Sequence, residues 1–182
     1  MKDLKSILKE CSIKEIYCDN HGAPITYVIP IYQRNYAWER DEICALIKDV
    51  HDSMDMGKTV YYIGTLVTYK RDENKYEVID GQQRLTTIYI ILRALGVQDI
   101  YSRLTYSARK ASASTIEALS GRGEKDDLGE MPDLGIKNGF DSAKAGLNEI
   151  VGLAQADVDK FKEYFLNHVH IIHYRVPKDV DL

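Results

Sequence analysis

The segment from Tyr76 to Gly96 constrains the fold most, because a strand pattern passes directly into a helix pattern through a single glycine turn. Residues 76–79 (Tyr-Glu-Val-Ile) alternate and are rich in types that favour strands. Asp80-Gly81 follows at once, and apolar residues then recur at helical spacing: Leu85, Ile88, Leu92 and Leu95. The segment therefore predicts an α+β domain, with a small mixed sheet and helices packed on it.

Similar patterns predict the other elements of this domain. Strands are expected at 25–29, 61–69 and 170–176, and 61–69 should form a hairpin with 76–79. Helices are expected at 3–10, 39–54, 97–107 and 140–153, followed by one that Asp157 caps. Residues 107–139 are rich in Ser, Gly, Asp and Lys, which predicts a flexible insertion.

Composition narrows the class of protein. The chain has 182 residues and a net charge of −4, which argues against a broadly basic nucleic-acid binder. Its three cysteines, Cys11, Cys18 and Cys44, lack paired spacing and are interpreted as reduced thiols. No apolar run follows the N-terminal charges, and the apolar stretch from Leu85 to Leu95 is too short to cross a bilayer. We therefore expect a cytoplasmic protein without membrane contact.

The turn after residue 79 carries the chemistry. A helix start favours anions, Gly81 allows close approach of the backbone, and Arg84 can grip phosphate oxygens as a fork. Gln82 and Gln83 offer donors and acceptors, and Asp80 could hold Mg²⁺ or orient a water. A plain capping turn explains the same residues about equally well. The phosphate loop GxxxxGK[ST] is absent, so a nucleotide would bind by another scheme.

The loop from Pro30 to Trp38 is the second candidate. It places Gln33 and Arg34 side by side among aromatic residues that could stack on a base. The alternative is that Tyr36 and Trp38 fasten the next helix to the core, with Arg34 in solvent. For Trp38 taken singly, a core position is the preferred interpretation.

Together these segments resemble a known family. I-P-x-Y-Q-R-x-Y-x-W, then Y-x-x-G-T, then V-I-D-G-Q-Q-R-L-T-T resemble the N-terminal domain of GmrSD-type modification-dependent restriction enzymes over about residues 25–95. The resemblance implies a ParB/sulfiredoxin-like core with helical C-terminal additions. It also implies a nucleoside triphosphate, with Mg²⁺, that is bound and hydrolysed in antiphage defence. Hydrolysis would be coupled to a nuclease domain or subunit, and DNA would be engaged through the full-length protein.

The resemblance also implies the site residues. Asp80, Gln82 and Arg84 would be catalytic, and the nucleotide or its phosphates would contact Gln33, Arg34, Gly81, Gln83, Thr86 and Thr87. For the two threonines, packing is an equally good explanation. No metal site is predicted, because His168 and His170 share a strand face that His173 does not.

Family members usually continue past a strand like 171–176 into an Asn-Arg-Gly segment and a helical region, and no HNH-like nuclease signature is present. Residues 1–182 are thus interpreted as a single N-terminal domain of a longer protein. We expect this piece to bind nucleotide without completing a turnover-competent site, and not to cut DNA. Two alternatives stay open: a ParB-like DNA-binding or nuclease domain, and a non-catalytic interaction module.

Overall fold

The strands form one mixed sheet. The computed structural model describes residues 8–19, 21–100, 103–119 and 132–177, and within them the strand order is β1-β6-β3-β4-β2-β5. The strands are β1 (Leu8–Ser12), β2 (Thr26–Ile29), β3 (Tyr61–Asp72), β4 (Lys75–Asp80), β5 (Leu104–Tyr106) and β6 (Val169–Val176). The β1–β6 and β3–β4 pairs are antiparallel, and the other neighbours are parallel. The predicted α+β class with a mixed sheet is confirmed.

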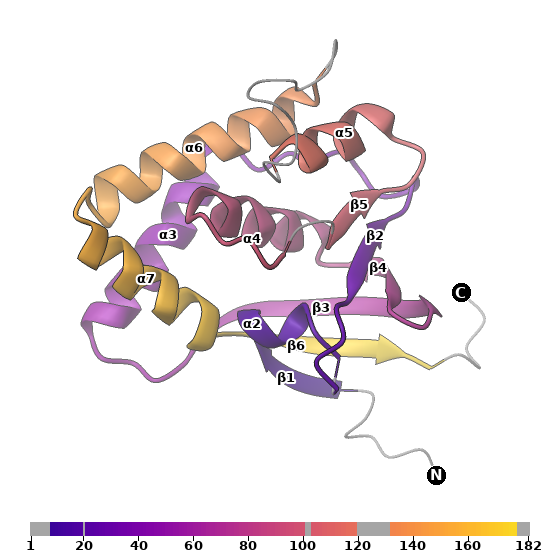
Figure 1. Ribbon diagram of the computed structural model, residues 1–182, viewed down its shortest axis with the longest axis horizontal. Coiled ribbons are helices and arrows are strands. Elements are labelled where there is room, and N and C mark those ends of the chain that lie inside the picture. The colour runs from indigo at the N-terminus through magenta and orange to yellow at the C-terminus, as the bar shows by residue number, and fades with distance from the viewer. Residues whose placement is uncertain (1–7, 20, 101–102, 120–131, 178–182) are drawn as a thin grey trace.

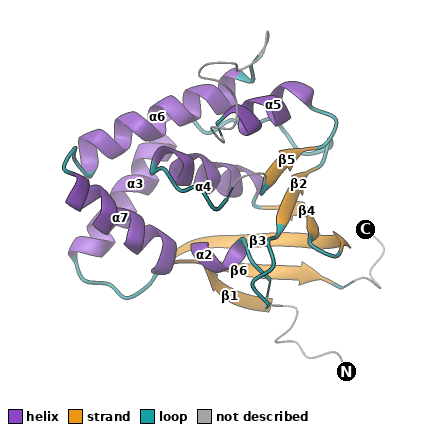
Figure 2. Ribbon diagram, viewed as in Figure 1, coloured by secondary structure: helices purple, strands orange, loops and turns teal. Residues whose placement is uncertain are grey.

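The larger helices gather on one side of this sheet (Figure 1), and colouring by secondary structure shows the same separation (Figure 2). The helices are α2 (Ile13–Ile16), α3 (Arg40–Asp55), α4 (Gln82–Ala94), α5 (Lys110–Ala118), α6 (Leu134–Ile150) and α7 (Gln155–Asn167). In the part of the chain that the structure describes, none of them is long and apolar enough to span a membrane.

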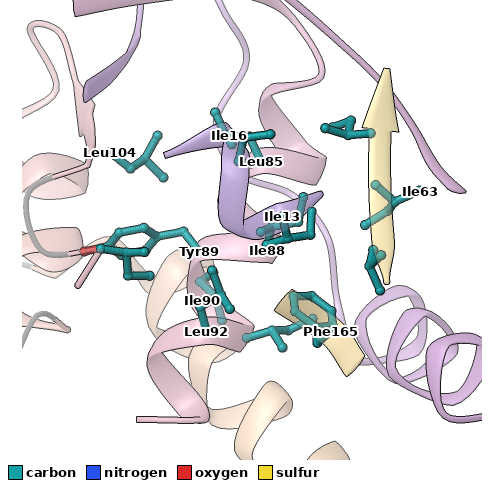
Figure 3. Close-up of a cluster of buried hydrophobic side chains, with 14 of the residues drawn as sticks. Ile13, Ile16, Ile63, Leu85, Ile88, Tyr89, Ile90, Leu92, Leu104 and Phe165 are labelled. Atoms are coloured by element: carbon teal, nitrogen blue, oxygen red, sulfur yellow. The ribbon is translucent and has the colours of Figure 1, made fainter. Parts of the chain in front are cut away.

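Helix α4 is the centre of the core. The five consecutive residues 88–92 have no exposed surface at all. Figure 3 shows side chains of α4 among those of α2, β3, β5 and α7. Five consecutive residues point to all sides of a helix, so other elements surround this part of α4 on every side. The sequence pattern indicated only one buried stripe on this helix.

The topology brings two distant loops to one edge of the sheet. Strands β2 and β4 are parallel neighbours, with Tyr27 opposite Tyr76 and Val28 opposite Glu77. The carboxyl ends of parallel strands point the same way, and in open α/β sheets ligands bind outside those ends. The loop after β2 and the turn after β4 therefore lie together, although almost fifty residues separate them in sequence.

Several sequence predictions about elements were wrong. Residues 8–10, expected in a helix, lie in β1, because they pair with β6 at the other end of the chain; residues 1–7 lie outside the described part. The expected helix at 97–107 contains β5, which pairs with β2. Helix α7 begins at Gln155 with Ala154 as its N-cap, so Asp157 lies in the first turn instead of capping it.

Helix α6 begins earlier than predicted, at Leu134, because the Asp133 side chain accepts a hydrogen bond from the Ile136 backbone N–H. The segment predicted as a flexible insertion, 107–139, thus contains α5 and the first turns of α6. Ser112 of α5 donates to Asp133 at 2.5 Å, which ties the two helices together. Residues 120–131 of this segment lie outside the described residues.

The imidazole of His173 on β6 is fully buried, near the rings of Tyr27 and Tyr76. Its Nε2 lies 2.8 Å from the hydroxyl of Thr68, and its Nδ1 has no hydrogen-bond partner among the described residues. Burial, and then the charges of Arg175 and Lys9, lower the pKa of His173 from 6.5 to about 3. The histidine is therefore neutral in the folded protein at neutral pH.

Acidification is expected to destabilise the domain through His173. The unfolded chain takes up a proton below about pH 6.5 and the folded chain does not, so stability falls as the pH falls toward 3. The expected loss in the free energy of unfolding is about 2 kcal/mol between about pH 7 and 5. Denaturant unfolding across this range measures it. A His173→Gln variant should lack this component, and an unchanged pH dependence in that variant would contradict the assignment.

Candidate functional site

A cavity of about 370 Å³ lies where the two loops meet. Its lining residues are Gln33, Arg34, Trp38, Thr65, Asp80, Gly81, Gln82, Gln83 and Arg84. The structure therefore brings together every predicted site residue except Thr86 and Thr87. Trp38 was considered mainly a core residue, and Thr65 was not predicted, although the Y-x-x-G-T motif at residues 61–65 pointed to its neighbourhood.

Gly81 makes the sharp passage from β4 into α4. Its φ of 91° is in the left-handed region, and a Cβ at this position would lie 2.8 Å from the carbonyl oxygen of Thr65. No side chain caps the start of α4, so no capping side chain takes up the first backbone N–H groups of the helix. These donors and the helix dipole make this wall of the cavity favourable for an anion.

Arg84 lies across the backbone of β3. Its Nη1 donates to the carbonyl oxygen of Thr65 at 3.0 Å. A Cβ on Gly64 would lie 2.9 Å from the central carbon of the guanidinium, so this position of Arg84 requires a glycine there. Gly64 has a φ of 120° and lies where the register of β3 against β6 shifts. This irregularity in β3 makes the space that the guanidinium occupies.

The two arginines of the cavity form no ion pair with a carboxylate in the described part of the chain. Arg40 and Arg71 each pair with a glutamate. Within the described residues, neither Arg34 nor Arg84 forms an ion pair, and the one hydrogen bond from the Arg84 side chain goes to a neutral carbonyl. Two unpaired guanidinium groups and a helix start, set against the one carboxylate of Asp80, give the cavity a local positive field despite the negative charge of the whole chain.

Gln82 and Gln83 hold the loop after β2 in place. Gln82 Nε2 donates to the carbonyl of Arg34 at 2.7 Å, and Gln83 Nε2 donates to the carbonyl of Asn35 at 2.8 Å. Gln83 Oε1 also accepts from the Ala37 N–H at 2.8 Å. Both ends of the Gln83 side chain are thus used by the protein. Sequence reasoning treated these amides as ligand contacts and missed this structural role.

Gln82 differs from Gln83 in the hydrogen bonding of its side-chain oxygen. Its Oε1 is buried and has no hydrogen-bond partner among the described residues, while the residue lines the cavity. A buried acceptor without a donor is costly, and such atoms in native proteins call for an explanation. A donor supplied by a bound molecule or a water would satisfy it.

The loop after β2 is also held from its other side. Arg109, at the N-cap of α5, donates to the carbonyls of Ile31, at 2.9 Å, and of Arg34, at 3.2 Å, and also to that of Gln33. Gln33 Nε2 in turn donates to the carbonyl of Ile79 at 2.7 Å. Arg109 was not predicted as part of the site, because its partners are backbone atoms more than seventy residues away in sequence.

Thr86 and Thr87 lie beneath the site and not in the cavity lining. Both are fully buried, and their hydroxyls lie 2.8 Å from those of Tyr106 and Tyr36 respectively. Burial raises the pKa of Tyr36 to about 12, so this hydroxyl stays protonated near neutral pH. The hydroxyl contacts of the two threonines join α4 to the loop after β2 and to β5.

Among the described residues that line the cavity, Asp80 is the single carboxylate. Mg²⁺ that accompanies a phosphate chain needs only one or two protein carboxylates, because the phosphates and water supply the remaining oxygens. In the described part of the chain, no group of three His, Cys, Asp or Glu side chains could hold a metal by itself. The lining therefore fits a cation that arrives with phosphates better than one held by the protein alone.

The comparisons with known proteins agree with the motifs. No curated protein sequence matches the chain. The family described as "GmrSD restriction endonuclease, N-terminal domain" matches residues 13–181, which include both loops of the cavity and all the strands after β1. The chain belongs to the GmrSD restriction endonuclease N-terminal domain family.

Proposed function

We propose that this domain binds a nucleoside triphosphate in the cavity at the start of α4, hydrolyses it, and thereby regulates a DNA-cleaving partner domain or subunit. Membership of the GmrSD N-terminal domain family makes the chain a component of a restriction system. The observation that carries the proposal is the pair of guanidinium groups, Arg34 and Arg84, which line one cavity without carboxylate partners in the described residues.

The phosphates would lie between these arginines and the first turn of α4. The N–H groups after Gly81 have no capping side chain, so they remain available to phosphate oxygens. A guanidinium matches two phosphate oxygens as a planar fork, and such charge-assisted bonds are about twice as strong as neutral ones. Trp38, which also lines the cavity, offers a ring on which a base or ribose could pack.

Hydrolysis would need a positioned water beside the terminal phosphate. Asp80 is the carboxylate of the lining that could orient such a water, and Gln82 Oε1, which is buried, could take part only after its side chain reorients. Arg84 would stabilise the charge that develops on the phosphate oxygens. Mg²⁺, when bound with the phosphates, would neutralise part of their charge, and Asp80 is the residue that would hold it.

A titration of the wild-type chain tests the proposal. Trp38 is the only tryptophan, so intrinsic fluorescence reports on the cavity directly. A ligand at a hundred times its Kd stabilises the folded state by about 2.7 kcal/mol, which raises the Tm of a chain of this size by about 5–10 °C. We expect this shift, with a change in Trp38 emission, for a nucleoside triphosphate with Mg²⁺.

In the same assay, inorganic tripolyphosphate separates the contribution of the phosphates to binding from that of the base and ribose. It should stabilise the chain through the phosphate contacts and bind more weakly than a nucleoside triphosphate, because it lacks the base and ribose. Release of inorganic phosphate from the triphosphate measures turnover, alone and with the nuclease partner present. A folded sample whose Tm responds to no nucleoside triphosphate and not to tripolyphosphate would overturn the proposed function.

A further inference from the structure

We propose that Arg109 is a positioning residue, which holds the loop after β2 so that Arg34 faces the bound ligand. The effect of Arg109 on ligand binding rests on the proposed function, but the hydrogen bonds by which Arg109 holds the loop are present without a ligand. Arg109 projects from the turn between β5 and α5, far from the β4–α4 turn in sequence, and it is not among the residues that line the cavity.

Arg109 acts on backbone atoms only. Its Nη2 donates to the carbonyls of Ile31 and Gln33, and its Nη1 donates to that of Arg34. A guanidinium presents its donors in a fixed plane, so three acceptors that converge on it are held in one arrangement. Residues 30–39 lie between β2 and α3 in an irregular conformation, and they pair with no strand of the described part of the chain. The conformation of the loop therefore depends on side chains of other elements.

Arg34 receives donors from two sides. Its carbonyl oxygen accepts from Gln82 Nε2 at 2.7 Å and from Arg109 Nη1 at 3.2 Å. These bonds fix the main chain of Arg34 from α4 and from the β5–α5 turn, while its side chain lines the cavity without an ion-pair partner in the described residues. A main chain fixed in this way reduces the backbone conformational entropy that the loop would lose on binding.

The turn that presents Arg109 is itself strained. Ala108 has a φ of 59°, the one positive value at a residue other than glycine in the described part of the chain. A side chain disfavours this conformation, and such residues persist only where their surroundings determine them. On one side of Ala108, the Ser107 N–H donates to the Ile29 carbonyl at 2.8 Å; on the other, Arg109 makes its three bonds. Both anchors lead to the loop after β2.

The first test needs no ligand. In Arg109→Ala we expect stronger quenching of Trp38 fluorescence by acrylamide and faster hydrogen exchange at the Gln33 and Ala37 amides, which are hydrogen-bonded in the wild type. Arg109→Lys should restore part of the protection, because it keeps a charged donor but loses the planar fork. Arg103→Ala, a change of the same type just before β5, is the control and should match the wild type. Circular dichroism and Tm establish that each variant is folded.

The second test asks whether Arg109 acts through Arg34. We expect Arg109→Ala to weaken tripolyphosphate binding about tenfold in the wild type and to have almost no effect in an Arg34→Ala background. A general loss of structure would lower affinity in both backgrounds. Wild-type loop protection in Arg109→Ala, or equal losses of affinity in the two backgrounds, would overturn the proposal. If the wild type binds no phosphate ligand, the proposed function fails. The exchange and quenching data alone then decide whether Arg109 holds the loop.

Discussion

Replacing Arg84 with alanine is expected to weaken the binding of a nucleoside triphosphate by about 30- to 100-fold while leaving the fold nearly as stable as the wild type. Hydrogen bonds to charged groups contribute about 1.5–3 kcal/mol, and the fork of Arg84 is proposed to grip the phosphates with such bonds. The one hydrogen bond of its side chain to a described residue, the Thr65 carbonyl, lies near the surface, so its loss costs little stability. Isothermal titration with tripolyphosphate and with a nucleoside triphosphate measures the change.

Two further variants sharpen this result. Arg84→Lys keeps the charge without the fork and should recover part of the affinity. Gly64→Ala keeps the arginine at position 84 but puts a Cβ 2.9 Å from its guanidinium carbon. The guanidinium should therefore be displaced from its present position, and binding should weaken. Arg103→Ala serves as the control for removing a positive charge. Wild-type affinity in Arg84→Ala would mean that the phosphates do not lie at this arginine.

The strand, turn and helix that build one wall of the cavity could be predicted because their signals are local. About twenty residues contain all three signals: a strand pattern up to residue 79, a glycine next to an aspartate, and apolar residues at helical spacing. The resemblance then placed the loop after β2 beside this turn. The parallel pairing of β2 with β4 explains the proximity physically, because the two strands end at the same edge of the sheet.

What the sequence did not reveal depends on contacts between distant segments. Gln83 was expected to contact a ligand, and the sequence did not reveal that its amide also holds the backbone of Asn35 and Ala37. Arg109 binds carbonyls, which every residue possesses, so no residue type in the loop marks its partners. Strand β1 forms only through pairing with β6, and local helix spacing near the N-terminus pointed the other way.

The start of α6 shows how packing outweighs helix propensity. Gly135 and Gly139 weaken a helix prediction, since glycine is among the poorest helix formers. In the structure a Cβ at Gly135 would lie 2.7 Å from the carbonyl oxygen of Tyr36, and one at Gly139 would lie 2.8 Å from its ring. The glycines let α6 approach the loop after β2 closely. The cost in propensity is therefore offset by a contact that supports the site, and a single-segment pattern does not contain that contact.

Replacing Gly81 with alanine is expected to lower the free energy of unfolding by about 2–4 kcal/mol. Two effects add: a side chain disfavours its left-handed φ of 91° by about 1–2 kcal/mol, and the new Cβ would lie 2.8 Å from the Thr65 carbonyl oxygen. That oxygen belongs to the backbone of β3 and also accepts from Arg84, so it cannot move aside without disturbing the cavity. Denaturant unfolding measures the loss as a lower midpoint with an unchanged slope.

Gly96 provides a matched control at the other end of α4. Its φ of 73° is also left-handed, but nothing lies within 4 Å of the position its Cβ would take. Gly96→Ala should therefore cost only the conformational part, about 1–2 kcal/mol, and should leave ligand affinity unchanged. The difference between the two variants isolates the collision with β3. Equal losses of stability would show that the backbone of β3 moves aside at Thr65. The close contact between the Gly81 turn and β3 would then not determine where α4 begins.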